Sequence, residues 1–205
     1  MVTVRKTREY KELLGVFTPL VNSINSSGSA KSFIKPHSAT LDRRFKKSGE
    51  RMMAFREVVE KLPKGETGTL LNTFVYLGLF ETSMTNMIDL VLLFLISLHH
   101  DFYLSYHRRY AESLEDLDSP SLAEKLHFLN KHKLQAFSKN MNKFLRNKIA
   151  HMEFDIDSDG RISIDNKKYD IEREVNLLMF FSAVVLAALD DSGAKNLLAE
   201  LRYSG

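Results

Sequence analysis

The chain has 205 residues, which is enough for one domain with a sizeable core and too few for two full-sized domains. Its composition, 44% hydrophobic and 27% charged, excludes a disordered chain, and the absence of cysteine excludes disulfides and thiolate metal sites. A formal net charge of +3 is too small to indicate a nucleic-acid partner by itself.

The first predicted element is an amphipathic helix over residues 3–20. Apolar side chains recur in it at spacings of three and four, and they are Tyr10, Leu13, Leu14 and Phe17. Pro19 is expected to end this helix, because proline lacks the N–H that a helix interior needs. The N-terminus shows no apolar stretch of the signal-peptide kind, so we expect a cytoplasmic protein.

A flexible loop is predicted after this helix. Residues 22–30 are rich in Ser, Asn and Gly, and no clear periodicity follows before Pro36. The first helix is therefore expected to be an arm. On this basis the chain divides into residues 1–45, which hold the helix and the loop, and residues 46–205, which form the main helical domain.

Two helices are predicted in the next part of the chain. The first covers residues 48–62 and ends at Pro63. The second covers residues 69–104 and is apolar on most sides, as expected for the central helix of a bundle. Glu81 and Asp89 interrupt it, and a membrane span needs roughly 20 apolar residues. We therefore expect a buried core helix and no membrane partner.

Two further helices are predicted before the chain reaches residue 150. Ser119 is expected to cap the first, which has Pro120 in its first turn and runs to about Asn130. The second covers residues 134–150. Its apolar stripe consists of Leu134, Phe137, Met141, Phe144 or Leu145, and Ile149.

A β-hairpin and two closing helices complete the predicted fold. Residues 153–157 and 161–165 alternate apolar and polar side chains about an Asp-Gly turn. Helices over 171–189 and 194–201 follow, with Leu177 among the side chains expected to face inward. The predicted class is all-α, a helical bundle with a small β-hairpin before its last helices.

A basic stretch precedes the hairpin. Residues 125–152 contain six lysines and Arg146 but no acidic residue. A surface of this kind attracts phosphates regardless of base sequence. The candidate RNA-binding residues are Lys139, Lys143 and Lys148. The alternative is a solvated helix face balanced by the acidic segments 112–118 and 153–159.

The basic helix ends in Phe-Leu-Arg-Asn-Lys-Ile-Ala-His, residues 144–151, followed by the predicted hairpin and another helix. This run resembles the Arg-Asn-x-x-x-His motif of the HEPN superfamily of ribonuclease and toxin-like domains, and the resemblance extends over about residues 50–190. It implies a HEPN-like bundle of four or five core helices, a homodimer that brings two motifs together, and RNA cleavage without a metal or other cofactor. Arg146, His151 and Asn147 would be the catalytic residues, with Asn147 in an orienting role.

Geometry limits how these residues can act together. Five residues along a helix turn by roughly 140°, so Arg146 and His151 share a face only if the helix ends or distorts near His151. Asn147 lies four residues before His151, so its amide could hold the imidazole. Imidazole exchanges protons at neutral pH and guanidinium forks onto phosphate oxygens, which suits attack by a ribose 2′-hydroxyl on its own phosphate.

Other interpretations of these residues stay open. Arg146 could instead pair with Glu153 while His151 caps the helix. Glu81 lies in an apolar helix and needs a partner, so it either pairs with a base such as Arg146 or reaches the cleft, and we treat it as a secondary site residue. No His and acid cluster with metal-ligand spacing occurs, so we predict no metal site.

The function expected from the resemblance is a metal-independent endoribonuclease used as a toxin or in antiviral defence. Its expected partners are RNA, a second copy of the chain and, for a toxin, an antitoxin of nucleotidyltransferase type. The alternative is a non-catalytic HEPN module that binds RNA, a nucleotide or a partner protein through the same cleft. A third hypothesis, a helical scaffold, would retain no RNA at low salt.

Overall fold

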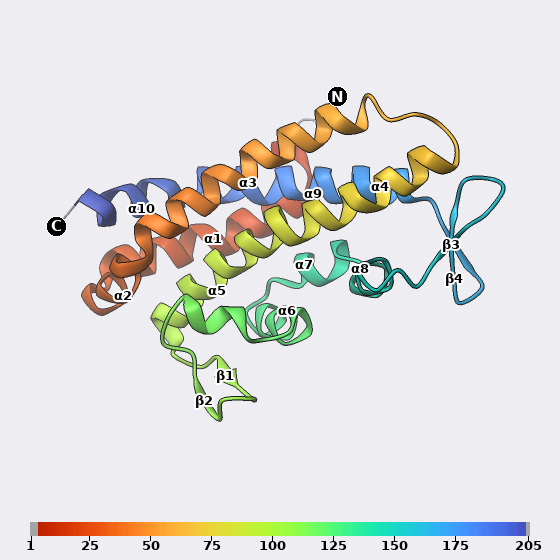
Figure 1. Ribbon diagram of the computed structural model, residues 1–205. Helices are drawn as coiled ribbons and strands as arrows, with labels where there is room; N and C mark the ends of the chain where they lie inside the picture. The colour runs from red at the N-terminus through yellow and green to blue at the C-terminus, as the bar shows by residue number, and fades with distance from the viewer. Residues whose placement is uncertain (1–3, 204–205) are drawn as a thin grey trace.

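A computed structural model describes residues 4–203, and most of them are helical (Figure 1). The long helices are α1 (Arg8–Ser26), α3 (Ser38–Val59), α4 (Glu66–Leu79), α5 (Thr85–His99) and α9 (Ile171–Asp191). The shorter ones are α2 (Gly28–Ile34), α6 (Leu122–Lys131), α7 (Gln135–Asn140), α8 (Lys143–Ala150) and α10 (Ala194–Tyr203). Single 3-10 turns are η1 (Val4–Lys6), η2 (Lys35–His37) and η4 (Glu115–Asp118). The predicted all-α class is confirmed.

The main bundle consists of α1, α3, α9 and a long central helix (Figure 1). A π-helical turn, η3 (Phe80–Met84), joins α4 to α5, so that Glu66–His99 is one continuous helix. This helix is long and apolar enough to cross a membrane by length and composition alone, but most of its apolar part is buried inside the protein. It is the predicted core helix, although it ends at His99 and not at residue 104.

The prediction that Pro19 ends the first helix is wrong, because α1 continues through it to Ser26. The apolar stripe goes on past the proline and buries Leu20, Val21 and Ile24. A proline inside a helix costs about 3 kcal/mol, whereas each buried aliphatic side chain contributes about 1.5–3 kcal/mol. Burial therefore outweighs the break. The predicted start at residue 3 lies outside the described residues.

The predicted loop at residues 22–36 is also wrong, since the end of α1 and helix α2 together occupy most of it. Ser27 caps this helix by accepting a hydrogen bond from the Ala30 backbone N–H at 3.2 Å. Ala30 and Ile34 are fully buried against the core, so two apolar anchors stabilise a segment that is polar by composition. Helix α1 packs against α9 and α5 and is not an arm. The position of our division, between residues 45 and 46, lies inside α3.

A small polar cluster joins the N-terminal region to the end of α9. Arg5 Nε donates to Asp191 at 2.6 Å, and the Tyr10 hydroxyl donates to the same carboxylate at 2.7 Å. These hydrogen bonds lower the pKa of Asp191 to about 2. The stability from the ionised carboxylate is therefore present above the ordinary aspartate pKa, about 4, and is lost as the pH falls toward 2.

We expect Asp191→Asn to lower the unfolding temperature by a few degrees at pH 7, because the amide cannot form the ion pair with Arg5. The effect is modest since the Arg5 side chain is 59% exposed. Thermal unfolding followed by circular dichroism across a pH series measures it. The gap between variant and wild type should close from about pH 4 toward pH 2, and a gap independent of pH would contradict the assignment.

The region before residue 150 differs from the prediction in two ways. Ser121, not Ser119, caps α6, and it forms a capping box with Glu124. The single helix predicted over residues 134–150 is two, because Met141 is extended and Asn142 starts α8 by accepting from the Leu145 N–H at 3.1 Å. Within this region Phe144 is 43% exposed, so the buried member of the predicted pair is Leu145.

The predicted hairpin is present as part of a three-stranded antiparallel sheet made of β3 (Asp155–Ile156), β4 (Ile162–Ile164) and β5 (Lys167–Tyr169). Thr69 of α4 donates to the carbonyl of Gly160 at 2.7 Å and fixes the turn to the bundle. A second hairpin, β1 (Tyr103–Leu104) with β2 (Arg109–Tyr110), was not predicted. The closing helices α9 and α10 are confirmed, except that Leu177 faces solvent.

Candidate functional site

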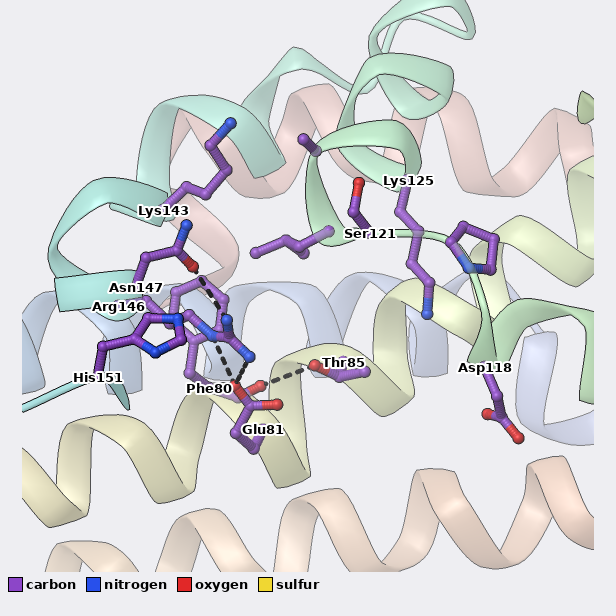
Figure 2. Close-up of a pocket in the computed structure, with 13 residues that line it drawn as sticks. Phe80, Glu81, Thr85, Asp118, Ser121, Lys125, Lys143, Arg146, Asn147 and His151 are labelled. Carbon is purple, nitrogen blue, oxygen red and sulfur yellow. Dashed lines mark hydrogen bonds and ion pairs between the residues drawn. The ribbon is translucent and has the colours of Figure 1, made fainter. Parts of the chain in front are cut away.

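A cleft of about 490 Å³ lies between α8, the π-helical turn η3 and the start of α6 (Figure 2). Five of the predicted site residues line it, namely Glu81, Lys143, Arg146, Asn147 and His151. Lys139 and Lys148 are not among its lining residues. The fold thus brings the motif together with an acid 65 residues earlier in the chain.

The end of α8 places His151 on the same cleft as Arg146. The helix stops at Ala150, and the His151 backbone N–H donates to the carbonyl of Asn147 at 3.1 Å. Met152 then adopts a left-handed conformation, with φ of 56°, and turns the chain away. Both the imidazole and the guanidinium point into the cleft (Figure 2). This is the helix end that the five-residue spacing requires.

Buried contacts hold α8 in position. Leu145 and Ile149 anchor it in the core. The hydroxyl of Tyr76, itself buried in α4, donates to the carbonyl of Asn142 at 3.3 Å. Burial raises the pKa of Tyr76, so this hydroxyl stays protonated and remains a donor at neutral pH. The N-cap of α8, the helix that carries the motif, is therefore fixed to the central helix.

Arg146 is held by two neighbours within the cleft. Its Nε donates to Glu81 at 2.6 Å, and its Nη2 forms an ion pair with the same carboxylate. Its Nη1 donates to the amide oxygen of Asn147 at 3.0 Å. Asn147 thus holds the guanidinium, whereas we expected it to hold the imidazole of His151. The pairing of Glu81 with Arg146, one of the two expected alternatives, is present.

Glu81 lies within the π-helical turn of the central helix. Such turns insert an extra residue into a helix and occur frequently at functional sites. Here the turn is supported by the Thr85 hydroxyl, which donates to the carbonyl of Phe80 at 3.1 Å. The side chains of Arg146 and Glu81 are 27% and 41% exposed, so solvent screens the pair and it contributes about 1 kcal/mol at most to stability. Its main effect is to orient the guanidinium.

The basic stretch is partly neutralised. Lys125 is buried and its ammonium donates to Asp89 at 2.7 Å, with Arg44 at 3.4 Å from the same carboxylate. Burial raises the pKa of Asp89, and the attraction of Lys125 and Arg44 opposes that shift. Lys125 therefore holds α6 on α5 and is not free for a phosphate.

The three lysines expected to bind RNA differ in their surroundings. Lys148 pairs with Glu153 at 2.8 Å and with Asp165 at 3.3 Å, which raises the pKa of its ammonium. Glu153 therefore pairs with Lys148. The alternative interpretation, in which Glu153 pairs with Arg146, is wrong. Lys139 and Lys143 are exposed, and among residues 4–203 no acid forms an ion pair with either. Of the three lysines, these two carry positive charge that remains available.

The α6 wall of the cleft was missed from the sequence. It consists of Asp118, Pro120, Ser121, Leu122, Ala123 and Lys125. The Ser121-x-x-Glu124 pattern signals a helix start, so the boundary could have been found. The position of α6 opposite α8 could not have been found from the sequence, because it depends on the ion pair between Asp89 and Lys125, which lie 36 residues apart.

Two histidines outside the motif, His99 and His132, lie close together. The rings of His99 and His132 lie 4.8 Å apart, and His132 approaches Asp101 at 3.5 Å. Across the described range, no set of three or more His, Asp or Glu residues is placed to hold a metal ion.

Comparisons of the chain with models of known protein families, with curated proteins and with solved structures give no match.

Proposed function

We propose that the protein is a metal-independent endoribonuclease of HEPN type, acting as a toxin or in antiviral defence. The observation that carries this proposal is the meeting of Arg146 and His151 in one cleft, at the point where α8 ends. A proton-transfer group and a fixed cation side by side are what phosphodiester cleavage by a ribose 2′-hydroxyl needs. Incubating the purified protein with labelled RNA in excess EDTA tests the proposal directly.

The roles follow from the chemistry of each side chain. The imidazole of His151 takes the proton from the 2′-hydroxyl as that oxygen attacks the adjacent phosphorus. Arg146 stabilises the extra negative charge on the phosphate oxygens as the bond to the 5′-oxygen breaks. Glu81 and Asn147 position the guanidinium by accepting hydrogen bonds from it. Lys143, on the cleft wall, attracts a neighbouring phosphate.

A second copy of the chain and an antitoxin belong to the same proposal. One chain supplies one Arg146 and one His151, so a homodimer that joins two motifs would supply the further acid, a protonated second His151, that protonates the leaving 5′-oxygen. For a toxin, the partner is an antitoxin of nucleotidyltransferase type. Light scattering on the purified protein distinguishes a dimer from a monomer.

One observation favours the alternative of a non-catalytic module. Arg146 is already engaged by Glu81 and Asn147, so an RNA phosphate must share or displace these contacts. A module that only binds RNA, a nucleotide or a partner protein has no catalytic cycle, so Arg146 need not exchange these contacts repeatedly. RNA that is retained but never cut, by wild type and by Glu81→Gln alike, would support this alternative.

The lysines give a graded prediction for RNA binding. Lys143→Ala and Lys139→Ala should each weaken binding about equally across sequences and reduce the salt slope by roughly 0.7 for each phosphate that is no longer neutralised. Lys148→Ala should change the slope less, because Glu153 and Asp165 already neutralise that ammonium. Fluorescence anisotropy with labelled RNA over a salt series, in EDTA and on a His151→Ala background, measures all three. A larger change for Lys148 than for Lys143 would contradict this order.

A further inference from the structure

The hairpin β1–β2 stands out from the helices beside the end of α5 (Figure 1). Tyr103 pairs with Tyr110 across it, and Leu104 pairs with Arg109. Because side chains alternate along a strand, Leu104 points into the protein and is buried while both tyrosines point outward. The hairpin is therefore anchored on one face and open on the other.

Three tyrosines are exposed on this hairpin. Tyr103 is 51% exposed, Tyr110 is 52% exposed, and Tyr106 at the turn is 89% exposed. The rings of Tyr103 and Tyr110 lie 5.4 Å apart, edge to face, and that of Tyr106 lies 5.2 Å from His107. Exposing the apolar surface of a large aromatic ring to water costs free energy, and a ligand that covers the ring recovers it. A flat apolar face next to polar groups is a surface on which planar bases stack.

The same segment is positively charged. From Tyr103 to Tyr110 the sequence contains His107, Arg108 and Arg109 and no acid. Arg109 is paired with Asp116 and fixes the hairpin to η4. Over the described part of the chain no acid forms an ion pair with Arg108, which sits at the turn with φ of 54°. A free guanidinium beside exposed rings fits a phosphate next to stacked bases.

A chain of hydrogen bonds connects the hairpin to the cleft. The hydroxyl of Ser105 donates to the carboxylate of Glu124 in α6. That carboxylate also accepts from the backbone N–H of Ser121 at 2.8 Å, and Ser121 lines the cleft. The root of the hairpin and the α6 wall of the cleft are therefore joined through the carboxylate of Glu124.

We propose that the β1–β2 hairpin binds a single-stranded segment of the RNA substrate, with bases stacked on Tyr106 and its neighbouring tyrosines and a phosphate on Arg108. We place the hairpin on the path of a strand that leaves the cleft past Ser121, because Ser121 lines the cleft and shares the carboxylate of Glu124 with Ser105 of the hairpin. The ligand is unpaired RNA because stacking needs a free base face, which a duplex does not offer. This inference rests on the proposed function, since it takes RNA as the substrate.

The test measures binding of a fluorescein-labelled oligouridine of about twelve nucleotides to the full chain in EDTA, on a His151→Ala background. Tyr106→Ala should weaken binding about tenfold, which corresponds to about 1.4 kcal/mol. Tyr106→Phe keeps the ring and should bind like the parent. Arg108→Gln should reduce the salt slope by roughly 0.7. Tyr203→Ala, which removes a tyrosine 76% exposed on α10, is the matched control and should change nothing.

Several outcomes would overturn the inference. Equal binding by Tyr106→Ala and its parent, or an equal loss on the same RNA made double-stranded, excludes stacking on the hairpin. Binding of a protein partner through this surface, with RNA binding unaffected, does so too. Cleavage is assayed separately with intact His151. If the wild type never cuts RNA but Tyr106→Ala weakens binding, the hairpin stands and the nuclease proposal fails. If RNA is cut equally well without Tyr106, only the hairpin proposal fails.

Discussion

His151→Ala is expected to reduce RNA cleavage by about 10²- to 10⁴-fold, the range typical for removal of a positioned acid or base, with little change in stability. His151 is exposed and holds its place through its backbone N–H, which alanine retains. Cleavage of labelled RNA in EDTA and thermal unfolding are measured on the same preparation. His127→Ala is the matched control, since His127 is exposed on α6 and lies outside the cleft lining.

Arg146→Ala should cause a comparable loss, and Arg146→Lys should recover only part of it because an ammonium lacks the planar fork of guanidinium. Glu81→Gln removes the negative charge that pairs with Arg146 and keeps the arginine itself. If Arg146 served only to hold α8, Glu81→Gln and Arg146→Ala would unfold at similarly lowered temperatures and lose activity in parallel. Wild-type-like unfolding, with a large loss of activity in Arg146→Ala and a smaller loss in Glu81→Gln, supports direct action of Arg146 on the phosphate and a positioning role for Glu81.

Replacing the ribose at the cleavage site by deoxyribose is expected to lower the rate of cleavage at that position by several orders of magnitude. The 2′-hydroxyl is held next to the phosphorus by the substrate itself, and this proximity is an advantage that an external water lacks. Products should carry a 2′,3′-cyclic phosphate and a 5′-hydroxyl, DNA should be spared, and EDTA should have no effect.

The deoxy substrate should still bind, because the phosphates available to Arg146 and Lys143 are unchanged. Anisotropy measures its affinity, and gel analysis of labelled fragments identifies the ends. An all-ribose oligomer of the same sequence is the control. Cutting that persists at the deoxy position, or that chelation abolishes, would rule out 2′-hydroxyl attack and favour a hydroxide made by a metal ion.

Much of the fold was predictable because its helices carry periodic apolar residues. The stripe of α9 and the alternating strands about Gly160 appear in the sequence as they do in the structure. The predicted loop was wrong because a segment of polar composition can still be helical when a few of its side chains are buried. The polar segment that holds Ala30 and Ile34 is helical because both side chains find a place in the core, which composition does not reveal.

The site was predictable to the extent that it is local. Arg146, Asn147 and His151 belong to one short run, and its helix end is visible from the hairpin that follows. The partner of Asn147 could not be predicted. It is Arg146 and not His151, because Glu81 places the guanidinium next to the Asn147 amide. The hairpin β1–β2 was missed because strands of two residues leave too short a pattern to recognise.

The construction of the cleft links ligand binding to folding. Its walls come from residues 80–85, 118–125 and 143–151, which meet only in the folded chain, so the unfolded chain offers no such site. A ligand present at 100 times its Kd then stabilises the fold by about 2.7 kcal/mol. For a chain of this length that corresponds to a rise in Tm of roughly 5–10 °C. Thermal-shift screening of oligonucleotides and nucleotides can therefore search for the natural ligand even where no cleavage is detected.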